Sequence, residues 1–243
     1  MAVYACADLH GQLSLLKQIQ NFVGPNDTVY FLGDAADRCR NGWQMIKDIA
    51  TDSRFVYIKG NHEDMLIRAA HEYFRFDYKG DEYYQLARNG GGYTFNDMLA
   101  DPDAEKWIGF IRHTPTYKIY NNAEGQIILL SHAGFTPWID EDGALIIPED
   151  EDLIWNRNHY LCDWKDDEML FNSIVVHGHT PIPYIAEDLR YDKTVEKNQK
   201  GPFWYANRHK VCIDNAAFYT NTAFLLNLDT FEYTEFTCEP DAE

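Results

Sequence analysis

Five short motifs in this 243-residue chain contain acidic, amide and imidazole side chains, which are groups that bind metal ions. They are Asp8-Leu9-His10-Gly11, Gly33-Asp34-Ala35-Ala36-Asp37-Arg38, Gly60-Asn61-His62-Glu63, Ser131-His132-Ala133-Gly134 and His177-Gly178-His179-Thr180. Six candidate ligands come from them: Asp8, His10, Asp34, Asn61, His132 and His179. Oxygen ligands mixed with imidazoles, without a thiolate, suit Mn²⁺, Fe or Zn²⁺ better than Ca²⁺ or Mg²⁺ alone.

These six side chains are more than one catalytic metal ion can use, because such an ion keeps a coordination position open. Two ions bridged by one carboxylate would accommodate all of them. Two ions about 3.5–4 Å apart can activate a water molecule and stabilise both the attacking and the leaving oxygen at phosphorus. A pair of ions held by these residue types is therefore suited to a phosphoryl displacement.

Each motif follows an apolar run with the character of a β-strand. In the first third of the chain, runs at 3–7, 28–32 and 55–58 alternate with helix-like patterns at about 13–23, 43–49 and 62–74. Three units of this kind predict a parallel sheet with helices on its faces. Ligands bind at the carboxyl ends of the strands in such sheets, so the motifs lie where a site is expected.

The later part of the chain is predicted to be rich in β-structure. Residues 117–120 and 127–130 predict a hairpin, and further β runs occupy 173–176, 211–213, 223–228 and 232–237. The segment at about 75–100 is rich in aromatic residues and glycine, and we interpret it as an insertion or cap rather than as regular sheet. This segment either shapes the access of substrate to the site or has a purely structural role.

The charge and composition exclude several classes of partner. A formal net charge of −18 does not suit binding to a nucleic-acid backbone, which needs clustered Lys and Arg. No apolar stretch approaches the roughly 20 residues that span a bilayer, and the first seven residues lack the basic charge and length of a signal peptide. We therefore expect a cytoplasmic protein without a nucleic-acid or membrane partner.

The cysteines are odd in number and scattered, without a C-x-x-C pair. This pattern is typical of reduced thiols rather than of a disulfide framework or a thiolate zinc site. The five residues are Cys6, Cys39, Cys162, Cys212 and Cys238.

The order and spacing of the five motifs resemble the phosphoprotein phosphatase family of the calcineurin-like metallophosphoesterases, especially its bacterial and phage serine/threonine protein phosphatases. The resemblance extends from Asp8 to Leu228 and so covers nearly the whole chain. It implies an α/β fold, a four-layer α/β/β/α sandwich, formed by a single domain over residues 1–243 with the 75–100 segment as its insertion or cap. It also implies two divalent metal ions, with Mn favoured over Fe or Zn.

The same resemblance implies a role for each ligand. Asp8 and His10 would bind the first ion, and Asp34 would bridge the two ions. The second ion would be bound by the remaining three ligands, Asn61, His132 and His179.

Catalytic and substrate-binding roles are also implied by the resemblance. His62 would protonate the leaving oxygen, and Asp37 would orient its imidazole. Arg38 and Arg157, the latter in Trp155-Asn156-Arg157, would bind the phosphoryl oxygens together with Asn61. A metal-bound hydroxide would attack phosphorus in line, without a phosphorylated enzyme intermediate.

Two positions depart from related patterns. Pro181 stands where phosphodiesterase-like relatives carry the last His of Gly-His-x-His, which favours the phosphatase branch. Cys39 replaces the Gly of the usual Gly-Asp-x-x-Asp-Arg-Gly. If that Gly needs a conformation special to glycine, the local turn is predicted to differ slightly, which leaves the placement of Arg38 open but not the metal ligands. Cys39 is either a small buried side chain or a redox-sensitive thiol beside the metals.

Simpler structural roles remain alternatives for single residues. An Asp after a strand, such as Asp8 or Asp34, commonly caps a helix. His132 and His179, taken alone, are compatible with hydrogen-bonded interior histidines, which is the role that we expect for His177. For Arg157 the alternative is a surface ion pair.

The leading functional hypothesis is a metal-dependent phosphomonoester hydrolase of the serine/threonine protein phosphatase type, acting on a phosphoprotein or a small phosphoester. One alternative is a symmetric dinucleoside tetraphosphate hydrolase, which shares these motifs. The other is a non-catalytic binding protein with a decayed site, against which the complete set of candidate ligands argues.

Overall fold

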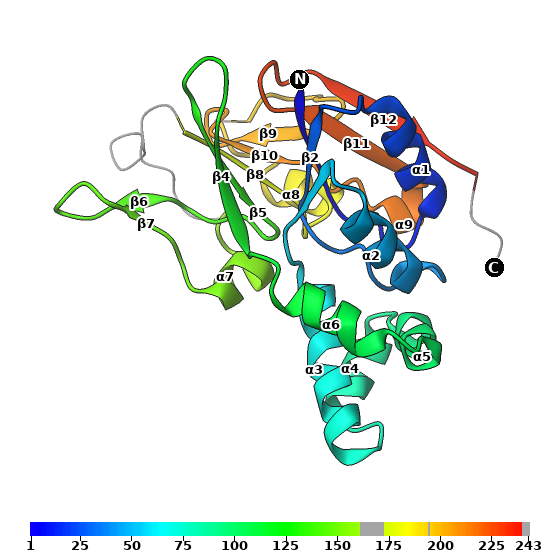
Figure 1. The fold of residues 1–243 in the computed structure, drawn as a ribbon. Coiled ribbons are helices and arrows are strands. Elements are labelled where there is room, and N and C mark those ends of the chain that lie inside the picture. The colour runs from blue at the N-terminus through cyan, green and yellow to red at the C-terminus, as the bar shows by residue number, and fades with distance from the viewer. Residues whose placement is uncertain (161–172, 194, 240–243) are drawn as a thin grey trace.

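Two five-stranded β-sheets face each other in the computed structural model, which describes residues 1–160, 173–193 and 195–239 (Figure 1). The first sheet has the strand order β12-β11-β1-β2-β3. Its strands are β1 (Val3–Cys6), β2 (Thr28–Phe31), β3 (Phe55–Tyr57), β11 (Thr222–Asn227) and β12 (Tyr233–Thr237). Strands β1, β2 and β3 are parallel, which confirms the prediction from the three βα units.

The second sheet has the order β4-β5-β8-β10-β9. Its strands are β4 (Tyr117–Asn121), β5 (Ile127–Ser131), β8 (Ser173–His177), β9 (Phe203–Tyr205) and β10 (Lys210–Cys212). The predicted hairpin is β4–β5, with Tyr117 opposite Ser131, while β5, β8 and β10 are parallel. Strand β9 and the small ribbon of β6 (Trp138–Ile139) and β7 (Leu145–Ile146) were not predicted.

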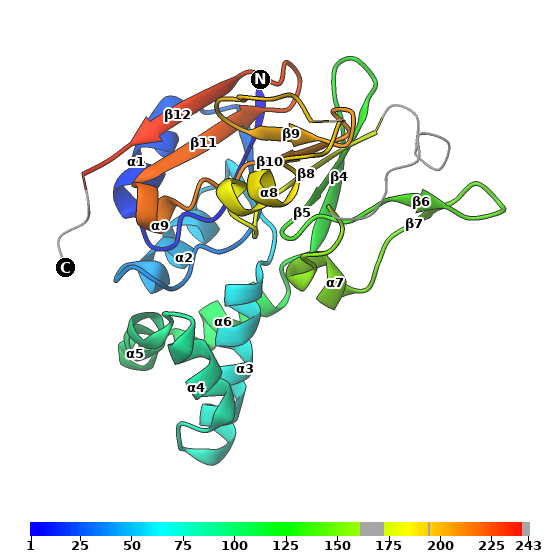
Figure 2. The same ribbon diagram turned by 180° about the vertical axis from the view of Figure 1, so that it is seen from behind.

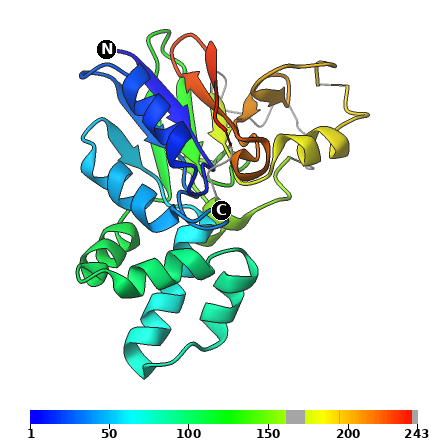
Figure 3. The same cartoon turned by 90° about the vertical axis from the view of Figure 1, so that its right-hand side faces the viewer.

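Helices cover the outer faces of both sheets and complete the four-layer α/β/β/α arrangement that was predicted. Helices α1 (Leu13–Phe22) and α2 (Gly42–Thr51) lie against the first sheet. Helices α7 (Asp150–Trp155) and α8 (Ile182–Asp188) lie against the second. Figure 3 shows the blue α1 and the yellow α8 on opposite outer sides, and the short helix α9 (Ala217–Thr220) precedes β11.

The layers are held together by separate apolar clusters because side chains alternate between the two faces of a strand. In β1, Val3 and Ala5 point into the core between the sheets, where they meet Leu130 and Val176. Cys6 instead points toward the outer helices. Burying an aliphatic side chain of this size stabilises the fold by about 1.5–3 kcal/mol, so this core fixes how the two sheets face each other.

Four consecutive helices extend away from the sandwich, at the bottom of Figures 1 and 2. They are α3 (Asn61–Phe76), α4 (Asp81–Arg88), α5 (Gly92–Ala100) and α6 (Ala104–Arg112). The segment at about 75–100 is therefore mainly helical. Its helices were not predicted, because Gly90–Gly92 and the dense aromatic residues obscure the helical spacing. The single-domain interpretation of the chain stays a prediction.

Two expectations about the molecule as a whole concern membranes and cysteines. Among the described residues, no helix is both long and apolar enough to cross a bilayer, while the cytoplasmic location stays a prediction. Four cysteines carry thiols that form no disulfide in the described part of the chain: Cys6, Cys39, Cys212 and Cys238. Cys162 lies outside the described residues.

Candidate metal centre

The six predicted ligands lie together at one edge of the sandwich, although they come from both sheets. Asp8, Asp34 and Asn61 follow β1, β2 and β3 of the first sheet, and His132 and His179 follow β5 and β8 of the second. The side chains of all six predicted ligands are at least 96% buried. The carboxyl ends of the parallel strands of both sheets thus converge on one site, as expected for an α/β protein.

Asp34 lies at the centre of this cluster. Its Oδ2 is 3.6 Å from Nε2 of His10, and its Oδ1 is 3.4 Å from Nε2 of His132. Two groups of side chains have ligand atoms within 4.8 Å of one another, and both groups contain Asp34: one adds His10 and His62, and the other adds Asp8 and His132. A carboxylate shared by two potential metal positions has the geometry of a bridging ligand.

Three ligand atoms from different elements converge beside Asp34. Nε2 of His132 lies 2.9 Å from Oδ1 of Asn61 and 3.1 Å from Nδ1 of His179, and the last two atoms are 3.0 Å apart. Two ligand atoms bound to one ion at about 2.1 Å and at a right angle lie about 3 Å apart. The spacing therefore fits one shared cation.

The hydrogen bonds of the histidines identify the nitrogen atoms that can bind a metal. Nδ1 of His132 donates to the carbonyl oxygen of Leu32 at 2.7 Å, and Nδ1 of His10 donates to that of Ala36 at 2.8 Å. Because a carbonyl oxygen only accepts, the proton is on Nδ1 and the lone pair is on Nε2. Nε2 of His132 then faces Oδ1 of Asn61 without a proton between them, which is an arrangement that a cation stabilises.

The protonation of the imidazoles also suits metal binding. Burial lowers the pKa of His10, His132 and His179 below the usual value of an imidazole. Neutral imidazole is the form that coordinates a metal ion. The residues present therefore fit a dinuclear metal centre.

Close packing across the two sheets orients Asp8. Its carboxylate accepts hydrogen bonds from the backbone N–H of His179 at 3.1 and 3.2 Å. A Cβ atom on Gly178 would lie 1.9 Å from Oδ2 of Asp8, so only glycine permits this approach. The His-Gly-His motif therefore needs its glycine as well as its last histidine.

Asp214 is a further buried carboxylate beside this site to which the sequence analysis assigned no role. Burial, and then the charge of Asp34, raise its pKa to about 7. Burial, followed by Asp214 and Asp34, raises the pKa of Asp8 well above its usual value. Three buried carboxylates that repel one another are stabilised by bound cations. The signal that could have identified Asp214 is its position two residues after the end of β10.

Glu63 is a second residue whose role in the site was not predicted from the sequence. Its carboxylate accepts hydrogen bonds from the backbone N–H groups of Asp34, Ala35, Ala36 and Gly60, and from the hydroxyl of Tyr57. Burial, followed by the charge of Asp34, raises its pKa to about 7. Glu63 thereby connects α3 to the loop that carries Asp34. Its place beside His62 in Gly-Asn-His-Glu was the available signal.

The backbone of the site is strained at several residues. Positive φ angles, which are uncommon for residues other than glycine, occur at Asp8 (55°), His10 (46°), Asp34 (59°) and His179 (66°). Such conformations persist only where the surrounding structure enforces them, and they cluster at functional sites. The hydrogen bonds of Glu63 provide such enforcement around Asp34.

His62 and Asp37 form a hydrogen-bonded pair next to Asp34. Nδ1 of His62 lies 2.8 Å from Oδ2 of Asp37, and its Nε2 lies 3.8 Å from Oδ2 of Asp34. Burial acts to lower the pKa of His62, but Asp34 and the bonded Asp37 outweigh it and raise that pKa above its usual value. Nε2 of His62, directed toward Asp34, can therefore carry a proton near neutral pH.

The two predicted phosphate-binding arginines are exposed next to the buried cluster. Nη2 of Arg38 is 3.4 Å from Nε2 of His62, and its guanidinium lies 4.2 Å from the ring centre of Phe218. Nη1 of Arg157 donates to the carbonyl oxygen of His179 at 3.3 Å and to Oγ1 of Thr180 at 3.1 Å. Arg157 is thus attached to a loop of the site rather than placed on a remote surface.

Two expectations about neighbouring residues have clear outcomes. Cys39 is absent from the residues with positive φ, whereas Asp37 (71°) and Arg38 (65°) adopt that conformation, so position 39 does not require glycine. His177 is a buried interior histidine, and its Nε2 lies 2.7 Å from the hydroxyl of Tyr205. The altered turn predicted from Cys39 therefore has no basis in the φ angle at that residue.

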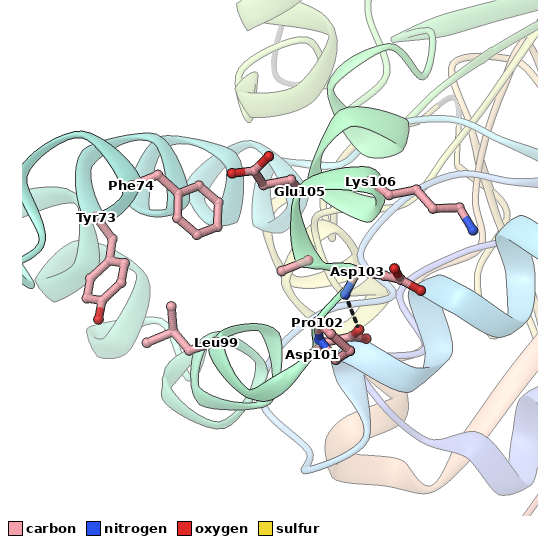
Figure 4. A pocket seen from close by; sticks show the side chains of 9 residues that line it. Tyr73, Phe74, Leu99, Asp101, Pro102, Asp103, Glu105 and Lys106 are labelled. Carbon is pink, nitrogen blue, oxygen red and sulfur yellow. Dashed lines mark hydrogen bonds between the residues drawn. The ribbon is translucent and has the colours of Figure 1, made fainter.

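A pocket of the helical extension is separate from this site. Tyr73, Phe74, Leu99 and Lys106 line it, together with the turn at Asp101 to Asp103 (Figure 4). None of the predicted site residues is part of its lining. This pocket therefore does not include the candidate metal centre.

Comparison with known proteins agrees with this geometry. Residues 1–213 match the model of the calcineurin-like phosphoesterases. A symmetrical bis(5'-nucleosyl)-tetraphosphatase of Pectobacterium atrosepticum is 26% identical over 164 residues, which cover 66% of this chain and 53% of that protein. The corresponding protein of Proteus mirabilis is also 26% identical over 164 residues, covering 66% and 54%. The chain spans about half the length of these curated relatives.

Solved structures show the same fold at low identity. A protein serine/threonine phosphatase from Saccharomyces cerevisiae has a TM-score of 0.56 and 16% identity, with 100% of this chain and 82% of that chain covered. A metallophosphoesterase from Sphaerobacter thermophilus has a TM-score of 0.57 and 13% identity, covering 99% and 90%. Because the sequence identities are only 16% and 13%, these similarities show a shared fold and not a shared activity.

Proposed function

The chain belongs to the calcineurin-like phosphoesterase family, and we propose that it is a metal-dependent phosphomonoesterase of the serine/threonine protein phosphatase type. Its substrate is a phosphoprotein or a small phosphoester with an alcohol as the leaving group. The observation that carries this proposal is the hydrogen-bonded pair of His62 and Asp37 beside Asp34.

This pair matters because of the leaving group. An alkoxide such as that of serine is a poor leaving group unless it is protonated as the bond to phosphorus breaks. The pKa of His62 is raised above its usual value, so its imidazole holds a proton on Nε2, the nitrogen that faces Asp34. Asp37 accepts a hydrogen bond from Nδ1. A positioned general acid of this kind accelerates a reaction by roughly 10²–10⁴-fold.

The same proposal assigns the metal ligands. Asp8 and His10 would hold one ion, Asp34 would bridge, and the other ion would be held by the remaining set of Asn61, His132 and His179. When bound, two divalent ions supply an activated water and neutralise charge on the phosphoryl oxygens. We propose Mn²⁺ as the native metal, since mixed oxygen and imidazole ligands suit it.

Arg38 and Arg157 would bind the phosphoryl group from the exposed side. Both arginines are exposed residues, and the guanidinium group of each approaches a histidine of the site through a contact of 3.3–3.4 Å. A guanidinium donates two parallel hydrogen bonds to phosphoryl oxygens, which orients the group as well as binding it. These two cations offset the strongly acidic character of the chain where an anionic substrate binds.

A second candidate function is the symmetric hydrolysis of dinucleoside tetraphosphates. The names of the curated relatives favour it, although they are only 26% identical and about twice as long as the matched region. A nucleoside diphosphate is a stable leaving anion and needs less help from a general acid. The buried His62–Asp37 pair therefore supports the phosphomonoesterase as the first choice.

A screen of product release separates the two candidates. The purified protein is incubated with a phosphoserine peptide, p-nitrophenyl phosphate and diadenosine tetraphosphate, each with Mn²⁺, Zn²⁺ or Mg²⁺, and Asp34→Asn serves as the inactive control. We expect phosphate release from the peptide with Mn²⁺. Release of ADP from diadenosine tetraphosphate without peptide hydrolysis would reverse the ranking. No bound metal and no turnover of any substrate would support the binding protein.

A further inference from the structure

The turn between α4 and α5 contacts the loop that carries Asp37 and Arg38. The backbone N–H of Arg38 donates to the carbonyl oxygen of Gly90 at 3.0 Å. The backbone N–H of Asp37 donates to Oγ1 of Thr94 at 3.0 Å. The helical segment that the sequence suggested to be an insertion or cap is thus bonded to two neighbouring residues of the candidate site.

This loop needs such support because of its backbone conformation. Asp37 and Arg38 are consecutive residues with positive φ angles of 71° and 65°. L-residues rarely adopt this region, so the surrounding structure must hold them there. The hydrogen bonds from α5 and from the preceding turn act directly on these two residues.

The turn approaches the loop closely enough to require glycine. Gly90 has a φ angle of 93°, and a Cβ atom on it would lie 3.1 Å from the backbone N and Cα of Arg38. Thr94, in the first turn of α5, is completely buried. Among the described residues, it supplies the only side chain of α5 that bonds the backbone of Asp37. Its hydroxyl is therefore the part of this contact that a substitution can remove.

We propose that Thr94 is a positioning residue, which through its hydroxyl holds the backbone of Asp37 and so places the carboxylate that orients His62. Asp37 bonds Thr94 through its main chain and His62 through its side chain, at 3.0 and 2.8 Å. Displacing the backbone of Asp37 therefore displaces the partner of the imidazole. This role rests on the proposed function, in which His62 protonates the leaving group.

The dependence of the reaction rate on the leaving group tests this role. Thr94→Val removes the hydroxyl at nearly constant volume, and Thr94→Ser keeps it. Glycerol 2-phosphate releases an alkoxide that needs a proton, whereas p-nitrophenyl phosphate releases a stable phenolate. We expect Thr94→Val to lower kcat for glycerol 2-phosphate by roughly 10–100-fold, part of the full effect of a general acid. The kcat for p-nitrophenyl phosphate should fall less than about threefold, because its phenolate leaves without a proton from His62.

The Michaelis constant and the metal content separate positioning from general damage. In Thr94→Val we expect KM to be unchanged and two metal ions per chain to be retained, and in Thr94→Ser we expect wild-type kcat on both substrates. Thr116→Val is the matched control, because Thr116 is also buried but its hydroxyl donates to a different partner. That partner is the carboxylate of Asp150, at 2.6 Å, which is not part of the His62–Asp37 pair. Its ratio of rates on the two substrates should equal that of the wild type.

Hydrogen exchange supplies a second readout that does not require turnover. In Thr94→Val, the amide of Asp37 should exchange faster than in the wild type, while Thr116→Val leaves that exchange unchanged. An equal loss of kcat on both substrates, or unchanged exchange at Asp37, would overturn the role of Thr94. A wild-type protein without phosphomonoesterase activity would instead reject the proposed function, and the exchange measurement would still decide whether Thr94 holds Asp37.

Discussion

The two sheets contribute different kinds of side chain to the same site. The edge of the first sheet carries most of the site residues with positive φ angles, among them Asp8, His10 and Asp34, and it also carries the hydrogen-bonded pair of His62 and Asp37. The edge of the second sheet contributes two imidazoles and the attachment of Arg157. In the proposed function, the first sheet therefore holds the general acid and the bridging carboxylate, and the second sheet completes the coordination of the metal ions.

The second sheet also depends on the first for the orientation of its ligands. Nδ1 of His132 donates to the carbonyl oxygen of Leu32 at the end of β2, and the N–H of His179 donates to Asp8. The first contact thus leaves Nε2 of His132 to face Asn61, and the second fixes the backbone of His179 against the first sheet. We therefore expect substitutions at the first-sheet edge to have larger effects than those at the second.

Asp34→Asn should have the largest effect of all. Loss of the shared carboxylate weakens both metal positions at once, so we expect loss of both ions and activity at background. Elemental analysis of metal per chain, measured together with phosphate release, tests this. Asp101→Asn is the control, because that carboxylate pairs with Lys47 rather than with the site, and it should keep both ions. An Asp34→Asn protein with two ions per chain would refute the bridging role.

His62→Asn should lower kcat on a phosphoserine peptide by roughly 10²–10⁴-fold, the scale for loss of a general acid. Metal content should change little, because the proposed ligands are intact. Steady-state kinetics and elemental analysis measure the two quantities. An unchanged kcat would show that another group protonates the leaving oxygen.

The pH dependence of kcat, compared between the wild type and His62→Asn, sharpens this prediction. The pKa of His62 is raised above 6.5 because Asp34 and Asp37 outweigh the effect of burial. Only the protonated imidazole donates, so kcat of the wild type should decrease as the pH rises through this raised pKa. This alkaline decrease should disappear in His62→Asn. A decrease of the same size in both proteins would assign it to a different group.

His132→Ala tests the second sheet and should have a smaller effect. It removes one ligand of a single metal position, so we expect one ion to be lost and the other to remain. The concentration of Mn²⁺ needed for half-maximal activity should rise by roughly 10–100-fold or more, and excess Mn²⁺ should restore part of the rate. The exposed His113 provides the control variant His113→Ala. Loss of both ions in His132→Ala would remove the distinction between the sheets.

Arg157→Lys should have the smallest effect. Lysine keeps the charge but loses the forked geometry, so we expect KM to rise about tenfold with little change in kcat. A charge-assisted hydrogen bond contributes about 1.5–3 kcal/mol, and about 1.4 kcal/mol corresponds to tenfold in affinity. Arg190→Lys, at an arginine that pairs with Glu187 on the surface, is the matched control. An unchanged KM in Arg157→Lys would favour a purely structural role.

Local patterns were sufficient to predict where the site residues lie along the chain. The apolar runs before Asp8, Asp34 and Asn61 predicted parallel strands, and the structure contains them. The functions of Glu63 and Asp214 were not predicted, because their importance depends on backbone groups and charges that are brought near them only by folding. The helices α4 and α5 escaped prediction for a different reason, since glycine and aromatic residues there weaken the helical pattern.

The amino-acid sequence by itself determined the chemical types of the ligands, their order, and their positions after strands, because these are local properties. Tertiary structure alone decided that Asp8 meets His179 across 171 positions of the chain and that Asn61 meets His179 across 118. It also left Nε2 of His10 and of His132 as the unprotonated ring nitrogen and placed Thr94 against Asp37. The physical reason is that such contacts depend on how the two sheets and the helical extension pack, which no short stretch of sequence encodes.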